Sequence, residues 1–230
     1  MTAMIKNRTE SRPKAVIWDM DGVIADTGPY HFRAWRKVFR ERGVELTEED
    51  FRRNFGKRND TIITNTLGNG IATAEIEAIS REKEATFRRL ISNNMKPMPG
   101  VTGLIKALAE AGFKQALGSS APIENIRLIL KSLGIADAFQ AITSGDEVTE
   151  GKPGPQGFLL AARKLVMEPG NCVVIEDAVA GVTAAKRAGM KCLAVTNTHP
   201  RERLAEADLI VDTLEKVTPS VLERLLNSKG

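Results

Sequence analysis

The chain has few of the features that mark extracellular, membrane-bound or nucleic-acid-binding proteins. It contains two cysteines, and both sit beside apolar runs, so a disulfide scaffold is not indicated. No segment approaches the ~20 consecutive apolar residues that a membrane-spanning helix requires. The first dozen residues are polar and are expected to form a frayed tail, not a signal peptide. These absences favour a cytoplasmic protein with no membrane partner.

The chain also lacks a large excess of charge of either sign. The chain has 33 basic and 29 acidic side chains, a formal net charge of +4, and the two signs are interspersed, as in Arg81-Glu82-Lys83-Glu84. Nucleic-acid-binding proteins gather basic residues in patches and interleave aromatic side chains on which bases stack. Aromatic residues make up only 5% of this chain, so no nucleic-acid partner is expected.

What the chain does contain is an alternation of short apolar runs and amphipathic stretches. The apolar runs predict strands buried on both faces, at residues 15–19, 114–118, 172–176, 191–195 and 209–211. Helical spacing of apolar residues predicts helices between them, at residues 101–111, 123–133, 157–166 and 179–188. This order predicts an α/β fold with a doubly wound parallel sheet. In such sheets the site lies at the carboxyl ends of the strands.

The alternation stops after the first strand. Amphipathic helices are predicted there, over residues 30–42, 47–55, 60–67 and 74–92. A helical block inserted at this point would lie over the carboxyl edge of the sheet as a lid. We therefore expect two domains, an α/β core formed by residues 1–28 and 97–230 and a helical cap formed by residues 29–96.

Two of the predicted strands end in pairs of carboxylates. Asp19 and Asp21 follow the first strand, and Gly22 would let the chain turn sharply after them. One carboxylate of such a pair can attack phosphorus while the other handles the proton of the leaving group. Glu176 and Asp177 end a later strand, where adjacent buried acids are costly unless a cation such as Mg²⁺ compensates them.

Hydroxyl and lysine side chains complete the set at the same edge. Ser119 and Ser120 follow another strand just before a predicted helix, where hydroxyls and free amides suit a phosphate oxygen. Lys152 lies between glycine and proline residues that fix the local backbone, so it could point at a bound phosphate. Each feature alone is also typical of a turn or a helix cap. Together, and in this order, they predict a phosphoryl-transfer site.

These four motifs resemble those of the haloacid dehalogenase superfamily of aspartate-nucleophile phosphotransferases. The resemblance implies a Rossmann-like core with an inserted four-helix cap. It also implies roles for individual residues: Asp19 as the phosphorylated nucleophile, Asp21 as the general acid and base, Ser119 as the phosphate-binding hydroxyl and Lys152 as the charge stabiliser.

The same resemblance implies a magnesium cofactor. The ion would be held by the carboxylates of Asp19 and Asp177 and by the main-chain carbonyl of Asp21. Glu176 would join them directly or through water.

A closer resemblance lies in the segment over residues 26–35, which is similar to the start of the cap in β-phosphoglucomutases and related sugar phosphatases. In that subgroup the residue that matches His31 relays protons between cap and core. The residue that matches Trp35 lines the cap interface, and Lys83 matches a lysine that contacts the substrate.

The chain departs from the mutase pattern at the position that would bind a second phosphate. The mutases place an arginine where this chain has Asn59, although Arg58 is adjacent and could serve as a substrate-binding residue. A mutase must exclude water and hold a second phosphate, so Asn59 favours hydrolysis. We therefore expect an Mg²⁺-dependent phosphatase of small phosphomonoesters, such as sugar phosphates, that forms an aspartyl phosphate on Asp19. The alternative is a β-phosphoglucomutase that interconverts β-glucose 1-phosphate and glucose 6-phosphate.

A receiver-type signalling module is the alternative from another class of protein. It also gathers acids, a lysine and a hydroxyl around Mg²⁺ at strand ends. Such a module needs a long-lived phosphoryl group, so it has no use for Asp21 beside the nucleophile or for a helical lid. A P-loop kinase is excluded because the glycine-rich Gly-Lys-Ser/Thr motif is absent. No motif indicates the oligomeric state.

Overall fold

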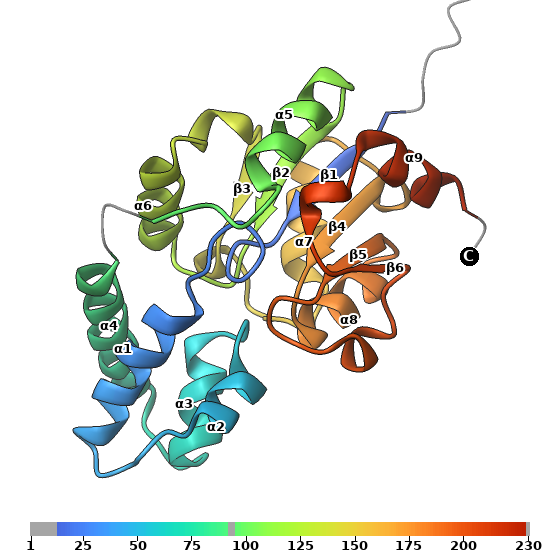
Figure 1. The fold of residues 1–230 in the computed structure, drawn as a ribbon. Helices are drawn as coiled ribbons and strands as arrows, with labels where there is room; N and C mark the ends of the chain where they lie inside the picture. The colour runs from blue at the N-terminus through green and yellow to red at the C-terminus, as the bar shows by residue number, and fades with distance from the viewer. Residues whose placement is uncertain (1–12, 92–94, 229–230) are drawn as a thin grey trace, which may run out of the picture.

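The computed structural model describes residues 13–91 and 95–228 (Figure 1). The tail predicted for the first dozen residues lies outside this range, and so does Ser92, the predicted end of the last helix of the inserted block. Within the described residues, no helix combines the length and the apolar character needed to cross a membrane.

A parallel sheet of six strands forms the centre of the larger part of the described chain. Its order is β3-β2-β1-β4-β5-β6, so the first strand lies in the middle, between β2 and β4. Every adjacent pair is parallel, which confirms the predicted fold class. The strand bounds are β1 Ala15–Trp18, β2 Lys114–Gly118, β3 Ala141–Thr143, β4 Cys172–Glu176, β5 Lys191–Val195 and β6 Leu209–Val211.

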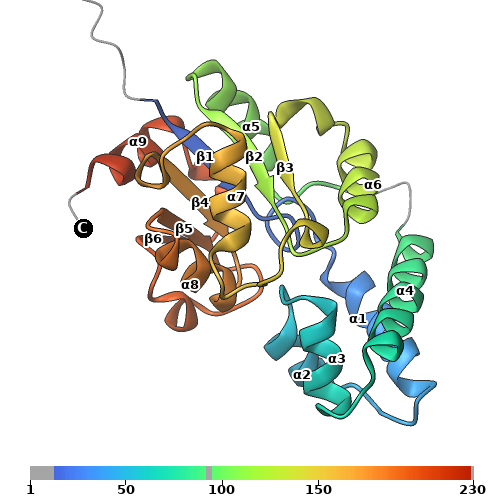
Figure 2. The ribbon, with the colours of Figure 1, turned by 180° about the vertical axis from the view of Figure 1, so that it is seen from behind.

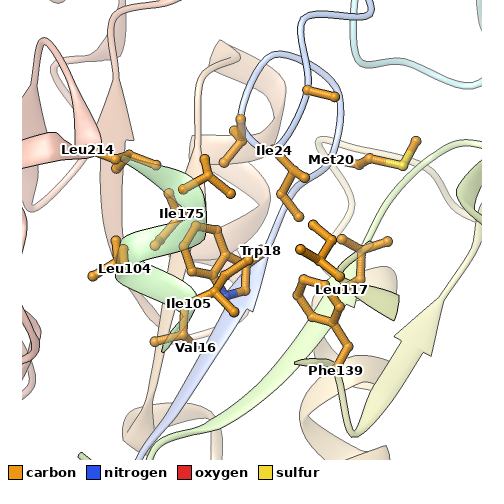
Figure 3. Close-up of a cluster of buried hydrophobic side chains, with 14 of the residues drawn as sticks. Val16, Trp18, Met20, Ile24, Leu104, Ile105, Leu117, Phe139, Ile175 and Leu214 are labelled. Atoms are coloured by element: carbon orange, nitrogen blue, oxygen red, sulfur yellow. The ribbon is translucent and has the colours of Figure 1, made fainter. Parts of the chain in front are cut away.

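Helices cover both faces of this sheet. Side chains on β1 point alternately to the two faces, and since all of them are apolar, both faces are buried. Trp18 points to the face covered by α5, α6 and α9, where it packs among Leu104 and Ile105 (Figure 3). Ile17 points to the opposite face, which is covered by α7 and α8. The bounds of these helices are α5 Val101–Glu110, α6 Ile123–Leu133, α7 Gln156–Lys164, α8 Val179–Arg187 and α9 Pro219–Asn227.

The register of the strands brings their carboxyl ends level. The last residue of β1 pairs with Leu117 of β2 and with Ile175 of β4. The amide of the next residue, Asp19, donates to the carbonyl of Ile175 at 3.0 Å. Asp19, Ser119 and Glu176 therefore lie at the same edge of the sheet.

Between β1 and α5 the described chain forms four helices, which we call the inserted helices. They lie as a group beyond the carboxyl edge of the sheet (Figures 1 and 2). Their apolar faces form a hydrophobic cluster of their own, which includes Trp35, Phe39, Ile63 and Ile79. They confirm the predicted helical insertion. Their bounds are α1 Gly28–Arg40, α2 Glu48–Asn54, α3 Asn59–Leu67 and α4 Thr73–Leu90.

The structure adds β3 and α9 to the elements predicted from the sequence. β3 is an edge strand of three residues, too short to give an apolar run that stands out from a loop. In α9, Leu222 and Leu225 lie three residues apart and pack against the sheet, a helical spacing that the sequence does contain. The other predicted strands and helices are confirmed, with ends shifted by one or two residues.

Candidate active site

The loops after β1 and β2 meet the inserted helices at the carboxyl edge of the sheet. They enclose a pocket, here called the inner pocket, whose walls include Asp21, His31, Lys83 and Ser120. Residues from both parts of the structure therefore face one space. His31, Lys83 and Ser120 come from segments that are more than 25 residues apart in the sequence.

Asp19, Lys152 and Glu176 form a buried group of charges beside this pocket. The Nζ atom of Lys152 lies 2.5 Å from Oδ1 of Asp19 and 2.6 Å from Oε1 of Glu176. It also lies 4.7 Å from the centre of the Phe158 ring. Burial lowers the pKa of Lys152, but the two carboxylates raise it by more, so the pKa lies above its usual range. Lys152 is therefore a permanent cation in contact with Asp19.

The carboxylate of Glu176 is held by several neighbours at once. Its Oε2 atom accepts hydrogen bonds from the amides of Asp177 at 2.7 Å and Ala178 at 2.8 Å, while Oε1 contacts Lys152. A Cβ atom on Gly181 would lie 1.6 Å from Oε1 of Glu176, so only glycine fits at this point of α8. Glu176 therefore fixes both Lys152 and the turn from β4 into α8.

Asp177 completes an acidic cluster that is suited to a divalent cation. One carboxylate oxygen from each of Asp19, Glu176 and Asp177 lies within 4.8 Å of the others, and all three side chains are buried. Thr198 donates to Oδ2 of Asp177, whereas Oδ1 is buried and has no hydrogen-bond partner among the described residues. An unpaired buried carboxylate oxygen is costly, and oxygen donors of this kind are the ligands of Mg²⁺. The residues present therefore fit a magnesium ion.

Without a bound cation, two of these acids, Asp19 and Asp177, have raised pKa values. Burial raises the pKa of Asp19 to about 8; Lys152 opposes this rise, while Glu176 and Asp21 add to it. Burial, followed by the charges of Glu176 and Asp19, raises the pKa of Asp177 well above its usual range. Because a bound cation favours the ionised carboxylate, metal binding and ionisation are linked at this cluster.

Asp21 lies in a sharp turn after β1. Gly22 adopts a φ of +85° there, and a Cβ atom at this position would lie 2.0 Å from Oδ2 of Asp177. Oδ1 of Asp21 accepts a hydrogen bond from the Thr27 hydroxyl at 2.5 Å and lies 3.2 Å from Nε2 of His31. Burial raises the pKa of Asp21, but His31 and Thr27 lower it by more, so the net shift is downward. Asp21 is therefore an ionised carboxylate in the wall of the inner pocket.

A buried network links Asp21 to α4. The Nζ atom of Lys83 lies 2.8 Å from Nδ1 of His31 and 2.7 Å from Oε1 of Glu84. The His31 ring stacks on Phe87 with 3.8 Å between ring centres. Burial and the charge of Lys83 lower the pKa of His31, and Asp21 opposes this shift only in part. His31 is therefore neutral at neutral pH, with Nδ1 accepting from Lys83 and Nε2 donating to Asp21.

The structure brings two more of the predicted residues to the inner pocket. Ser120 lines its core side, next to Ser119, whose buried hydroxyl accepts a hydrogen bond from the Ala121 amide at 3.1 Å. Trp35 lines the pocket from the inserted helices, and Nζ of Lys83 lies 5.2 Å from the centre of the Trp35 ring. The core thus contributes a serine to the pocket, and the inserted helices contribute an aromatic ring beside a lysine.

Arg58 is a predicted substrate-binding residue, and its side chain is hydrogen-bonded to the core. Its Nη1 atom donates to the main-chain carbonyl of Gly145 at 2.9 Å and to that of Val148. Its Nη2 atom lies 3.2 Å from Asp60. The neighbouring Asn59 donates to Glu84 at 2.8 Å. Arg58 therefore joins the start of α3 to the loop after β3.

Three residues at the site were not expected from the sequence: Thr27, Glu84 and Thr198. The two threonines hold the carboxylates of Asp21 and Asp177, and no local pattern distinguishes them from other loop hydroxyls. Glu84 lies in a run of alternating charges that indicates a solvated helix face. The helical spacing of Ile79, Lys83 and Phe87, all of them buried, is the signal that could have placed this stretch in the interior.

The fold and the site together define an α/β enzyme with a buried acidic cluster beneath inserted helices. A family model described as haloacid dehalogenase-like hydrolase matches residues 13–189. The chain belongs to this family, which confirms the resemblance seen in its motifs.

Relatives include both a mutase and a phosphatase. The chain is 35% identical over 217 residues to β-phosphoglucomutase of Bacillus subtilis (strain 168), a match that covers 91% of this chain and 93% of the relative. It is 31% identical over 184 residues to fructose-1-phosphate phosphatase of Escherichia coli (strain K12), covering 80% and 97%. Among solved structures, β-phosphoglucomutase from Clostridium difficile is similar with a TM-score of 0.86 at 29% identity, covering 94% of this chain and 98% of that one.

Proposed function

We propose that the protein is a phosphatase of small phosphomonoesters and that its substrates are sugar phosphates. The observation that carries this proposal is the contact between Asp19 and Lys152 at the end of β1, beside an acidic cluster that fits magnesium. A carboxylate nucleophile, a fixed cation and metal-binding acids are the groups that phosphoryl transfer through an aspartyl phosphate needs. The activities named for the Bacillus and Escherichia relatives support phosphorylated sugars as the substrate class.

The proposed reaction has two steps. In the first, the carboxylate of Asp19 attacks phosphorus and the bond from phosphorus to the ester oxygen breaks. Asp21, which first takes up a proton from solvent by way of His31, gives that proton to the ester oxygen. In the second, Asp21 takes a proton from water, the water oxygen attacks phosphorus, and the Asp19 carboxylate leaves. The products are the alcohol and inorganic phosphate. The lowered pKa of Asp21 suits the second step, and His31, hydrogen-bonded to Asp21, would relay protons at this point.

Residues from both parts of the structure would hold the substrate. Lys152 would balance the charge of the transferred phosphoryl group, and the hydroxyls of Ser119 and Ser120 would bind its oxygens. Lys83 and Trp35 would contact the sugar from the inserted helices. This division is supported by the inner pocket, whose walls come from both sides.

The proposed metal site uses the acidic cluster described above. Asp19, Asp177 and the main-chain carbonyl of Asp21 would hold Mg²⁺. Glu176, which already contacts Lys152, would act directly or through water. When bound, the ion would neutralise charge on the phosphate oxygens and favour the ionised carboxylates.

We also propose the division into a core of residues 1–28 and 97–230 and a cap of residues 29–96. The separate hydrophobic cluster of the inserted helices supports it, because a unit with its own core can move as a body. Helix α1 begins at Gly28, one residue before the proposed boundary.

A β-phosphoglucomutase is the second candidate, favoured by the mutases among the relatives. It would share the first step but would return the phosphoryl group to the sugar, and it would hold a second phosphate. The side chains nearest to that task are already engaged, Asn59 with Glu84 and Arg58 with main-chain carbonyls. Hydrolysis is therefore the better match to this site.

The test is Mg²⁺-dependent turnover on a panel of phosphomonoesters that includes fructose 1-phosphate and β-glucose 1-phosphate. Each reaction is run with and without a glucose bisphosphate primer, and Asp19→Asn is the control. We expect release of inorganic phosphate by the wild type and none by the variant. Primer-dependent formation of glucose 6-phosphate without phosphate release would show that the mutase is the correct assignment, and equal turnover by Asp19→Asn would overturn both.

A further inference from the structure

A cleft of about 710 Å³ lies between the inserted helices and the core, next to the inner pocket. We call it the outer cleft. Asn59, Glu84 and Ser120 belong to the walls of both spaces, so the pocket and the cleft adjoin at these residues. A substrate whose phosphate lies near Asp19 would place its far end against them, on the side of the outer cleft. The charges that line the cleft then decide which groups that far end can carry.

The lining of the outer cleft carries more acidic than basic side chains. Five carboxylates and three arginines line it. Each arginine already has a partner: Arg58 binds carbonyls of the loop after β3, Arg88 binds Asn125 at 2.9 Å, and Arg81 lies 3.6 Å from Glu77. A second phosphate would meet an excess of negative charge there, and an arginine could bind it only by giving up an existing contact.

Glu84 is the carboxylate that lies where the pocket and the cleft join. It is only 5% exposed, and both of its oxygens have partners. Oε1 accepts from Lys83 at 2.7 Å and from Asn59 at 2.8 Å, while Oε2 accepts from Asn125 at 2.5 Å. The ion pair with Lys83 balances the lysine charge that would otherwise attract an anion. A carboxylate held this firmly cannot rotate away from a bound ligand.

We infer that Glu84 determines specificity, selecting phosphomonoesters whose far end carries hydroxyl groups and rejecting those that carry a second phosphate. This inference rests on the proposed phosphatase function. Carboxylate oxygens accept hydrogen bonds from sugar hydroxyls, whereas their charge repels a phosphate. Rejection by a fixed like charge is a common route to specificity, because it acts only on the wrong substrate.

The test compares kcat/KM for fructose 1-phosphate with kcat/KM for fructose 1,6-bisphosphate, which differs only by the far phosphate. We expect the wild type to prefer the monophosphate by about tenfold or more. Glu84→Gln keeps the shape of the side chain but removes its charge, so the preference should fall about tenfold. Glu82→Gln is the matched control, because it removes the same charge from α4 at a position that lines neither space.

A second variant covers the case in which Glu84→Gln does not fold. Ser80 lines the outer cleft one helical turn before Glu84 and is partly exposed, so a longer side chain is tolerated there. Ser80→Lys should shift the preference toward the bisphosphate, whereas Ser80→Gln, of similar length but uncharged, should not. Hydrolysis of p-nitrophenyl phosphate, which has no charged far end, should be similar in both Ser80 variants.

The outcomes separate this inference from the proposed function. If p-nitrophenyl phosphate is hydrolysed but neither charge change alters the ratio for the fructose phosphates, the inference is overturned and the proposed function stands. If no ester is hydrolysed, the proposed function fails. Calorimetric binding of the two fructose phosphates to the same variants then decides the inference: a shifted ratio of Kd values supports it, and an unshifted ratio overturns it.

Discussion

At the scale of single residues, the site is built from buried charges that depend on one another. Lys152 is shared by Asp19 and Glu176, and Asp177 keeps one carboxylate oxygen without a hydrogen-bond partner in the described chain. Removing one member of such a group leaves another charge buried and unpaired, which costs more than the contact itself contributed. Substitutions in or against this cluster should therefore change metal binding or stability.

Binding of Mg²⁺ should depend on pH. Protons and the cation compete for Asp19, whose pKa burial raises to about 8, so protonation weakens binding below that pH. The apparent Kd for Mg²⁺, measured by calorimetry, should fall as the pH rises from about 6.5 to about 8, by up to about tenfold per pH unit. Asp177→Asn should raise the Kd at every pH. If neither pH nor this substitution changes the Kd, Asp19 and Asp177 do not bind the metal.

Gly181 is expected to tolerate no side chain. The Cβ of Gly181→Ala would lie 1.6 Å from the Glu176 carboxylate, so the variant should lose about 1–3 kcal/mol of stability and most of its turnover. Gly157→Ala is the control, because Gly157 lies near the start of α7 and its added Cβ would meet no atom within 4 Å beyond its chain neighbours and the helix's own backbone. It should be neutral or stabilising by up to about 1 kcal/mol. Urea unfolding measures both, and equal midpoints would contradict the predicted clash.

At the scale of elements, two contacts join the inserted helices to the core beside the outer cleft. Arg58 at the start of α3 reaches the carbonyls of Gly145 and Val148, and Arg88 on α4 reaches Asn125 of α6. Both connect a helix end or face to the core by hydrogen bonds. Such contacts can break and form again as the helices move, which suits a lid that admits substrate.

Removing the Arg58 contact should loosen α3. In Arg58→Ala, amide hydrogen exchange across Asn59–Leu67 should be faster than in the wild type, and KM for fructose 1-phosphate should rise several-fold. Arg53→Ala, on α2, removes an exposed arginine that pairs with Glu49 and Asp50 of its own helix, and it should change neither quantity. A raised KM with unchanged exchange would mean that Arg58 binds substrate instead of joining α3 to the core.

At the scale of the whole molecule, the sequence predicted the fold where apolar runs and helical spacing were long. The five apolar runs became strands, and because β1 lies between β2 and β4, the motifs at their ends came together as expected. The edge strand β3 left no such signal. Contacts between distant parts of the chain could not be predicted either. Glu84 accepts a hydrogen bond from Asn125, 41 residues away, and the alternating charges around Glu84 gave no sign that it is buried. The hydrogen bonds from Arg58 to the carbonyls of Gly145 and Val148 also join segments that are distant in the sequence, so no local pattern predicts them.

The most direct test of Asp19 as the nucleophile is mass spectrometry of the protein quenched in acid during turnover of fructose 1-phosphate with Mg²⁺. We predict a phosphoryl group on the peptide that contains Asp19, absent from Asp19→Asn and stable enough in acid to be assigned to that residue. Steady release of inorganic phosphate with no phosphoryl group on this peptide, or its appearance on another residue, would contradict Asp19 as the nucleophile.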